Sequence, residues 1–192
     1  MFDVDPSLRD AAIAVLAETG WDGFTLERVA DVVGVSRSTL WRQGVSRDSL
    51  IAGLVSELAE DFQSSMYPVL TTEGTGRERL ELSLAALCDV LDRHLPLMLA
   101  TDEAFHQAPA PGQQPIYLGP FIQFLREGAA DGTLSPGSDG PELVDVADVL
   151  MNGVAWTYTH LRGRHGWAAK RARPAIIGLM VRGLLPNPTL EV

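Results

Sequence analysis

The chain has 192 residues, of which 46% are hydrophobic and 21% charged, and its formal net charge is −10. This length allows one large domain, or a small domain joined to a larger one, with a sizeable buried core. No run approaches the roughly 20 apolar residues of a membrane helix. The acidic N-terminus is unlike a signal peptide, and the single cysteine excludes an internal disulfide. We therefore expect a soluble, cytoplasmic protein with no membrane segment.

Three helices are predicted at the start of the chain. The first begins after Asp5, a cap residue followed by proline, and ends near Gly20. Thr25 can cap a second helix. Ser36 can cap a short third helix that ends near Arg42.

The rest of the chain also shows helical spacing of its apolar residues and no convincing alternating strand. A fourth helix, capped by Ser46, is expected to extend to about Tyr67. Later helices are expected at residues 77–94, 116–130, 142–162 and 167–185, with the last bent at Pro174 and loops at residues 108–115 and 134–140. The predicted fold is all-α, with about nine helices.

The second and third helices, joined by a glycine–valine turn, have the layout of a helix-turn-helix. Gly34 gives the sharp turn its backbone freedom, and Val35 and Leu40 would hold the third helix against the core. Five polar residues are then left to face outward: Arg37, Ser38, Thr39, Arg42 and Gln43. Arginine and glutamine can read base edges in the major groove, and serine and threonine can bond phosphates.

The charges are unevenly distributed along the chain. A net charge of −10 argues by itself against a nucleic-acid partner. Residues 34–47, however, contain Arg37, Arg42 and Arg47 and no acidic residue, while the rest of the chain carries the negative excess. A small basic patch on an acidic body suits a protein that contacts DNA at one defined surface.

The run TLERVADVVGVSRSTLW at residues 25–41, followed by SRDSL at residues 46–50, carries a family resemblance. Together with its flanks, at residues 8–54, it resembles the DNA-binding region of the TetR family of bacterial regulators in order and spacing. The resemblance implies an N-terminal three-helix helix-turn-helix domain at residues 1–47. It also implies a C-terminal helical ligand-binding and dimerisation domain at residues 48–192.

By this resemblance, nine residues would form or support the contact with a double-stranded DNA operator. The phosphate contacts would be Thr25, Thr39, Trp41 and Arg47; the base-reading or adjacent positions would be Arg37, Ser38, Arg42 and Gln43; and Ser36 would cap the recognition helix.

Three positions depart from the family pattern. Trp41 stands where tyrosine is usual, and its indole N–H can donate a hydrogen bond to phosphate but cannot accept one. Arg47 stands where lysine is usual and keeps the charge. Gly44 stands where a large aromatic residue is usual, which removes a core anchor that Val45 or Trp21 would partly replace.

The two C-terminal helices, at residues 142–162 and 167–185, carry apolar residues around most of their circumference. A helix that is apolar all round must be covered on both sides. We therefore expect these helices to form the interface of a homodimer. A two-fold dimer would also match a palindromic operator, because one helix-turn-helix reads one half-site. The alternative is that both helices are central to the core of a single chain.

Aromatic and methionine side chains with a few polar tips indicate a pocket for a mostly apolar small molecule in the C-terminal domain. The candidate lining residues are Met98, Phe105, Tyr117, Phe121, Phe124, Met151, Asn152, Trp156 and Tyr158. At each position the alternative is ordinary core packing. Cys88 lies on an apolar face and is expected to be a small buried residue. No metal-ligand spacing or Gly-rich phosphate loop is present, so neither a metal nor a cofactor is predicted.

The sequence thus predicts a ligand-responsive transcriptional regulator, a repressor that dissociates from its operator when a small molecule binds. A relative that has lost DNA binding and serves as an interaction or carrier protein is the alternative suggested by Gly44 and the acidic net charge. Salt-dependent DNA affinity would separate these two classes. An enzyme is the third class, but the sequence shows no nucleophile elbow or phosphate loop to support it.

Overall fold

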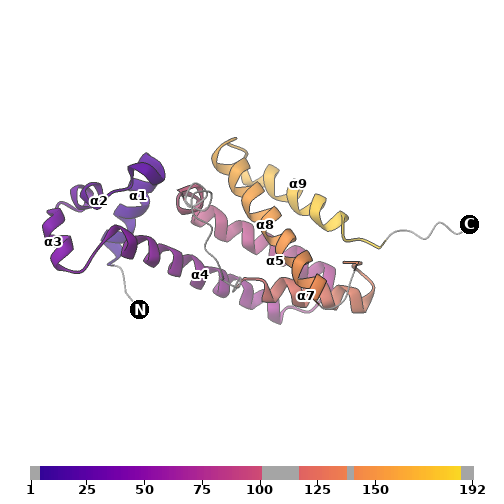
Figure 1. Ribbon diagram of the computed structural model, residues 1–192. Coiled ribbons are helices and arrows are strands. Elements are labelled where there is room, and N and C mark those ends of the chain that lie inside the picture. Colours follow the sequence, from indigo (N-terminus) through magenta and orange to yellow (C-terminus); the bar gives the residue numbers. More distant parts are fainter. Residues whose placement is uncertain (1–4, 101–116, 138–140, 187–192) are drawn as a thin grey trace, which may run out of the picture. The chain divides into compact units, whose positions relative to one another are not determined.

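A computed structural model describes residues 5–100, 117–137 and 141–186, and all regular secondary structure in these ranges is helical (Figure 1). The predicted all-α fold is confirmed. Phe105 and the predicted loop at residues 108–115 lie outside the described residues. None of the helices in the described part of the chain is both long and apolar enough to cross a membrane.

The chain forms two compact units. The described residues of the first unit are 5–61 and 94–100, and those of the second are 62–93, 117–137 and 141–186. The division falls inside one helix, α4 (Arg47–Thr71). The N-terminal unit therefore contains the predicted helix-turn-helix and also takes up a helical stretch, residues 95–100, that follows in the chain after a helix of the other unit.

The N-terminal unit begins with α1 (Pro6–Gly23), α2 (Leu26–Val33) and α3 (Arg37–Arg42). Each starts with a side-chain cap, as predicted. The oxygens of Asp5, Thr25 and Ser36 accept hydrogen bonds from backbone N–H groups at 2.8, 3.3 and 3.1 Å. α2 ends at Gly34, whose φ of 78° places it in the left-handed region that the turn requires.

The start of α4 is closed by a reciprocal pair of serines. The Ser49 N–H donates to Ser46 Oγ at 3.0 Å, and the Ser46 N–H donates to Ser49 Oγ at 2.8 Å. This arrangement satisfies two backbone donors that an uncapped helix start would leave open, in the manner of a capping box. Ser46 therefore caps α4 as predicted.

Apolar residues from every helix of the N-terminal unit meet in one core. Val29 and Ala12 are fully buried in it, and Ala30 is almost so. The other members are Leu8, Ala11, Val15, Leu16, Phe24, Leu26, Leu40, Val45, Leu50, Leu54, Leu97 and Ala100. Because Leu97 and Ala100 come from the later helical stretch, this core is completed by residues far away in the sequence.

Two helices extend beyond their predicted ends. α1 continues to Gly23 with a kink at Gly20, where φ is 66° and ψ is −168°. α4 continues through Pro68 to Thr71. The hydroxyls of Thr71 and Thr72 donate to the Pro68 carbonyl oxygen at 3.1 and 2.8 Å, which satisfies an acceptor that the end of the helix would leave open.

The C-terminal unit is built from the end of α4 with α5 (Gly76–Arg93), α7 (Gly119–Asp131), α8 (Pro141–Gly163) and α9 (Ala169–Arg182). Helix α5 packs against α7, α8 and α9, and α8 packs against α7 and α9. The largest fully buried side chains of this unit include Phe121, Phe124 and Tyr158. Helix α5 is thus the central element of the unit.

The start of α5 packs tightly on the end of α7. A Cβ atom added to Gly76 would lie 2.0 Å from the Gly128 backbone nitrogen, so only glycine fits at this crossing. The Asp131 carboxylate accepts a hydrogen bond from the Gly76 N–H at 2.7 Å. Hydrogen bonds from Thr133 and Gly76 lower the pKa of Asp131 below its ordinary value. Arg79 pairs with Glu127 and lies 4.6 Å from the centre of the Phe124 ring.

Candidate nucleic-acid interface and effector site

Helix α3 presents most of its polar side chains to solvent. Arg37, Ser38, Arg42 and Gln43 are exposed, as predicted for the outer face of a recognition helix. Leu40 is only 2% exposed and holds the helix to the core. Trp41 is 72% exposed, which is unusual for so large an apolar ring. The structure therefore offers α3 to a partner surface along its whole length.

Hydroxyl groups cluster at the start of α3. Ser36 Oγ lies 2.8 Å from both Ser38 Oγ and Thr39 Oγ1, and it also accepts the Thr39 N–H. A cluster of hydroxyls next to the exposed start of a helix can donate to phosphate oxygens. The predicted sites at Ser36, Ser38 and Thr39 are thus brought together, while Thr25 caps α2.

Arg37 pairs with a carboxylate of α2. Its Nη1 lies 2.6 Å from Glu27 Oε1, and both side chains are more than half exposed. An exposed ion pair of this kind contributes little stability and is easily exchanged for another partner. Arg42 is less constrained, since its Nε makes only a long hydrogen bond of 3.4 Å to the Ser38 carbonyl oxygen. Both guanidinium groups can therefore turn toward a base edge or a phosphate.

Arg47 is engaged with its own unit. Its Nε donates to the Phe24 carbonyl oxygen at 2.9 Å and its Nη2 to the Trp21 carbonyl oxygen at 3.1 Å. Its guanidinium also lies 4.2 Å from the centre of the Trp21 ring. These contacts tie the first residue of α4 to the α1–α2 connection, a role that the sequence did not indicate.

The aromatic residue missing at Gly44 has a local substitute. Gly44 adopts φ of 79°, a conformation that side chains rarely take up. The following residue, Val45, is buried at 8% exposure in the core, and the half-buried Trp21 packs against the same core. Of the two residues expected to replace part of this anchor, Val45 lies in the core and Trp21 packs against it.

Comparison with known proteins assigns the N-terminal region. Residues 8–54 match the family model described as bacterial regulatory proteins, tetR family. This range covers α2, α3 and the exposed residues described above. This region of the chain therefore matches the DNA-binding region of the TetR family, as the sequence resemblance implied. The match supports the predicted helix-turn-helix DNA-binding region and the predicted class of ligand-responsive transcriptional regulator.

Similarity to known regulators extends beyond residues 8–54. The fatty acid metabolism regulator protein of Bacillus subtilis (strain 168) is 24% identical over 136 residues, which cover 68% of this chain and 70% of that protein. The structure of FadR from Bacillus subtilis in complex with stearoyl-CoA has a TM-score of 0.71 at 19% identity, covering 93% of this chain and 98% of that one. The ketosteroid transcriptional regulator of Mycobacterium tuberculosis has a TM-score of 0.64 at 17% identity, covering 97% and 98%.

The candidate effector residues fall in different places. Met98 is buried in the N-terminal unit, and Phe105 lies outside the described residues. The other candidates belong to the C-terminal unit. Tyr117 packs edge-on against Phe62 with ring centres 5.0 Å apart, and Phe121 lies 6.3 Å from the same ring. This aromatic cluster includes Phe62, which the sequence did not single out because it lies in the middle of a long amphipathic helix.

The candidates on α8 differ in exposure. Met151, Asn152 and Trp156 are half-buried, and Asn152 donates to the Asp148 carboxylate at 2.8 Å. Phe124 is fully buried under Arg79. Met151, Asn152 and Trp156 thus remain partly accessible to a ligand, whereas Phe124 packs within the core.

Tyr158 takes part in a polar network. It is fully buried, and its hydroxyl donates to Asp92 Oδ2 at 2.7 Å. Arg162 donates to the other oxygen of Asp92 at 2.6 Å. Burial, more than the nearby carboxylate, raises the pKa of Tyr158 to about 12. The Tyr158 hydroxyl therefore serves to join α8 to α5, and sequence reasoning missed its two charged partners because they are distant in the chain.

Cys88 is buried on α5, as predicted. Burial raises the pKa of its thiol to about 12, so the reactive thiolate is strongly disfavoured.

Proposed function

We propose that this regulator is a repressor that binds a palindromic operator as a homodimer and is released by a small, largely apolar molecule. The observation that carries the proposal is the exposed face of α3, where Arg37, Ser38, Trp41 and Arg42 surround a hydroxyl-rich helix start. In a helix-turn-helix such a face enters the major groove. Arg42 and Gln43 would read bases, and Thr25, Thr39 and Trp41 would bind phosphates.

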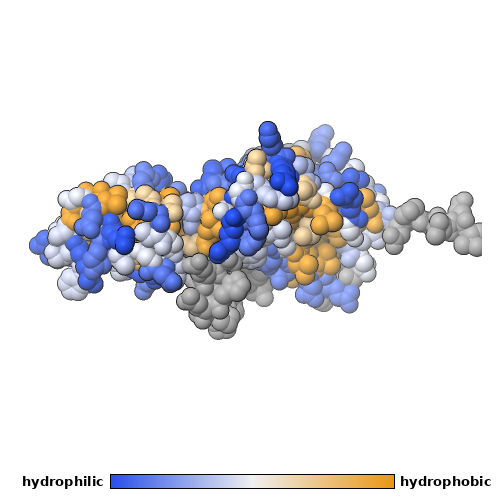
Figure 2. All heavy atoms as spheres, turned by 90° about the horizontal axis from the view of Figure 1, so that it is seen from above, coloured by the Kyte–Doolittle hydropathy of each residue, from blue (hydrophilic) through white to orange (hydrophobic). Residues whose placement is uncertain are grey.

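The homodimer is proposed to form through α8 and α9. Val149 is 72% exposed on α8 and Leu179 is 65% exposed on α9, although both are large apolar residues. Exposed apolar residues on neighbouring helices mark an interaction surface. Figure 2 shows hydrophobic residues in orange among hydrophilic ones on this side of the C-terminal unit. A two-fold dimer would place two recognition helices on two half-sites.

The effector is proposed to bind in the C-terminal unit beside the aromatic cluster of Phe62, Tyr117 and Phe121 and the half-buried residues of α8. An aromatic lining favours a ligand with a long apolar part. Stearoyl-CoA in the structure of the Bacillus subtilis FadR is such a ligand. We therefore expect an acyl-chain compound, and long-chain acyl-CoA is the first class to test.

Release from DNA requires the effector to favour a shape that does not fit the operator. Two connections in the chain could carry such a change. Helix α4 contributes residues to both units, and α5 leads directly into residues 94–100, whose Leu97 and Ala100 complete the core of the N-terminal unit. A shift of α5 or α4 on ligand binding would thus act on the core beneath α3.

The test is a mobility-shift assay with DNA from upstream of the gene at two salt concentrations. We expect the wild type to prefer this DNA over random DNA, and Arg42→Ala to reduce affinity about tenfold, since one good base contact gives about 1–3 kcal/mol. Arg126→Ala, an exposed arginine of α7, is the matched control and should bind like the wild type. If the wild type is folded but binds the upstream DNA no better than random DNA, the proposal is refuted. The protein would then belong to the alternative class that has lost DNA binding.

A further inference from the structure

The C-terminal part of the chain has a second concentration of positive charge. No acidic residue occurs between Asp148 and Glu191, a segment that holds six of the chain's 15 lysines and arginines. Five of these six, with His160 and His165, lie at residues 160–173, which we call the α8–α9 turn. On a chain with a net charge of −10, this is a strong local reversal of charge.

Two of the five cations are bonded to carboxylates of α5. Arg162 donates to Asp92 at 2.6 Å and, through Nη1, to the Trp167 carbonyl oxygen at 2.5 Å. Arg173 pairs with Asp89. Since Asp89 and Asp92 both lie on α5, these bonds fasten the α8–α9 turn to the central helix of the C-terminal unit. The position of the turn is therefore set by contacts within the C-terminal unit itself.

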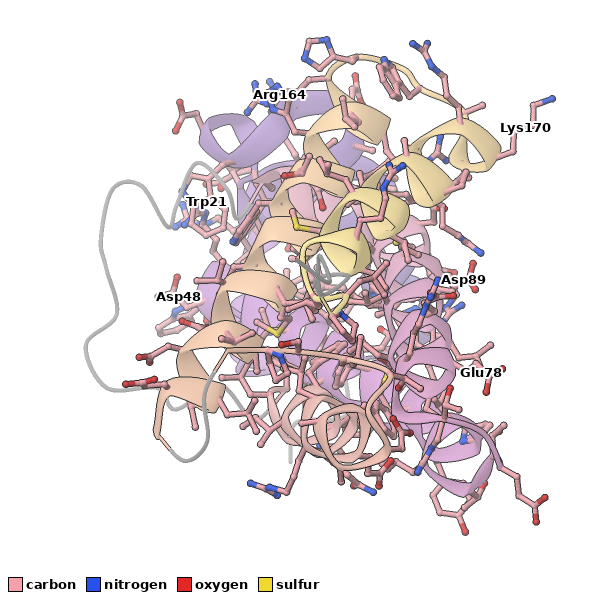
Figure 3. All side chains as sticks on the ribbon, turned by 90° about the vertical axis from the view of Figure 1, so that its right-hand side faces the viewer. Trp21, Asp48, Glu78, Asp89, Arg164 and Lys170 are labelled. Atoms are coloured by element: carbon pink, nitrogen blue, oxygen red, sulfur yellow. The ribbon has the colours of Figure 1, made fainter. Side chains whose placement is uncertain are left out.

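The other charged side chains of the α8–α9 turn face solvent. Arg164, Lys170 and Arg171 are exposed, as are His160 and His165. Figure 3 shows Arg164 and Lys170 at the same end of the unit, with the Lys170 side chain pointing away from the ribbon. Among the described residues, no carboxylate forms an ion pair with Lys170 or Arg171. Lys170 and Arg171 thus present positive charge that no carboxylate of the described residues offsets by an ion pair.

Aromatic rings are interleaved with these cations. The Arg171 guanidinium lies 3.6 Å from the centre of the Trp167 ring, and the His160 and His165 rings lie 4.8 Å apart. Exposed cations bind phosphate oxygens, and indole, imidazole and guanidinium planes stack on nucleobases. The combination fits a ligand that carries phosphate groups on a nucleotide.

We propose that the α8–α9 turn binds the phosphate-bearing nucleotide headgroup of the effector, with Lys170 and Arg171 as the main phosphate contacts. This rests on the proposed function, since it assigns a second part of the same effector, whose acyl chain occupies the C-terminal unit. The effector is favoured over operator DNA as the occupant because the turn belongs to the C-terminal unit and is bonded to α5, the helix that also packs on α7 and its aromatic residues.

The experiment measures binding of three probes to the purified full chain by titration calorimetry: palmitoyl-CoA, palmitate and coenzyme A. The wild type is expected to bind palmitoyl-CoA more tightly than either part alone, with an affinity that falls as salt rises. Lys170→Glu should weaken palmitoyl-CoA about tenfold and leave palmitate unchanged. Lys170 lies in the first turn of α9, where a carboxylate is electrostatically favoured, so this variant should fold at least as stably.

Arg126→Glu is the matched control, because it makes the same charge change at an exposed position on α7 of the same unit. It should bind all three probes within about twofold of the wild type. If both variants weaken palmitoyl-CoA binding equally, the change in net charge explains the effect, and the proposal is overturned. If the wild type binds palmitate as tightly as palmitoyl-CoA, the proposal is also overturned. That result would still agree with an apolar effector in the C-terminal unit. If Lys170→Glu instead lowers operator affinity and not palmitoyl-CoA affinity, the turn is a DNA contact and the proposal is wrong.

Discussion

Arg47 shows how one side chain can be placed by contacts that no local pattern reveals. Family resemblance predicts a phosphate contact, and the position at the exposed start of α4 is compatible with one. In the structure, two of its nitrogens bond the carbonyl oxygens of Trp21 and Phe24, and its guanidinium stacks on the Trp21 ring. The side chain therefore stabilises the DNA-binding unit, and any phosphate it reaches is left with Nη1 and the second N–H of Nη2.

We expect Arg47→Ala to lower the free energy of unfolding by about 1–3 kcal/mol, because it removes two charge-assisted hydrogen bonds and a ring contact. Urea unfolding measures this. Arg47→Lys should recover less than half of the loss, since lysine lacks the planar fork. In both variants, the slope of log operator affinity against log salt concentration should equal that of the wild type. A slope reduced by about 1 in Arg47→Ala, with unchanged stability, would instead establish Arg47 as a phosphate contact.

At the scale of the elements, the sequence correctly predicts each helix cap and turn that depends on neighbouring residues. Asp5, Thr25, Ser36 and Ser46 cap the helices they were expected to cap, and Gly34 adopts the left-handed conformation of the turn. These features depend on residues within three positions of each other. The residue types at neighbouring positions are therefore sufficient to locate them.

Sequence-based prediction fails for features that depend on packing between residues far apart in the chain. The proline at position 68 suggested the end of α4, yet the helix continues to Thr71. The helical stretch at residues 95–100 was missed, although Leu97 and Ala100 belong to the core of the N-terminal unit. The polar network around Asp92 joins residues about 70 positions apart, such as Arg162 at a separation of 70. No spacing rule connects side chains across such distances.

The crossing of α5 and α7 gives a prediction at this scale. Gly76→Ala should destabilise the C-terminal unit by about 2–3 kcal/mol, because the added Cβ would meet the Gly128 backbone and the helices would have to move apart. Gly119→Ala is the control, since a Cβ there has no neighbour within 4 Å. Thermal unfolding of both variants measures the difference. Equal melting temperatures would mean that the two helices are not packed as closely as the structure describes.

For the whole molecule, the proposed function assigns separate exposed surfaces to DNA, to the effector and to a second copy of the chain. The N-terminal unit exposes arginines and Trp41, the α8–α9 turn exposes cations, and the sides of α8 and α9 expose Val149 and Leu179. The acidic remainder of the chain repels DNA elsewhere. Under the proposed function each partner has its own surface, and the apolar one is the surface that a second copy would cover.

Leu179→Asp tests that assignment, because a buried charge in a dimer interface is costly when it has no partner. In sedimentation velocity at micromolar concentration, the wild type should be a dimer and Leu179→Asp largely a monomer. Operator affinity should then fall at least about tenfold, because each monomer engages only one half-site. Leu82→Asp, which places the same charge at a 46% exposed leucine of α5, should remain dimeric. A dimer that survives Leu179→Asp but not Leu82→Asp would move the interface from α9 to α5, and the spacing of the two recognition helices would have to be derived from that surface instead.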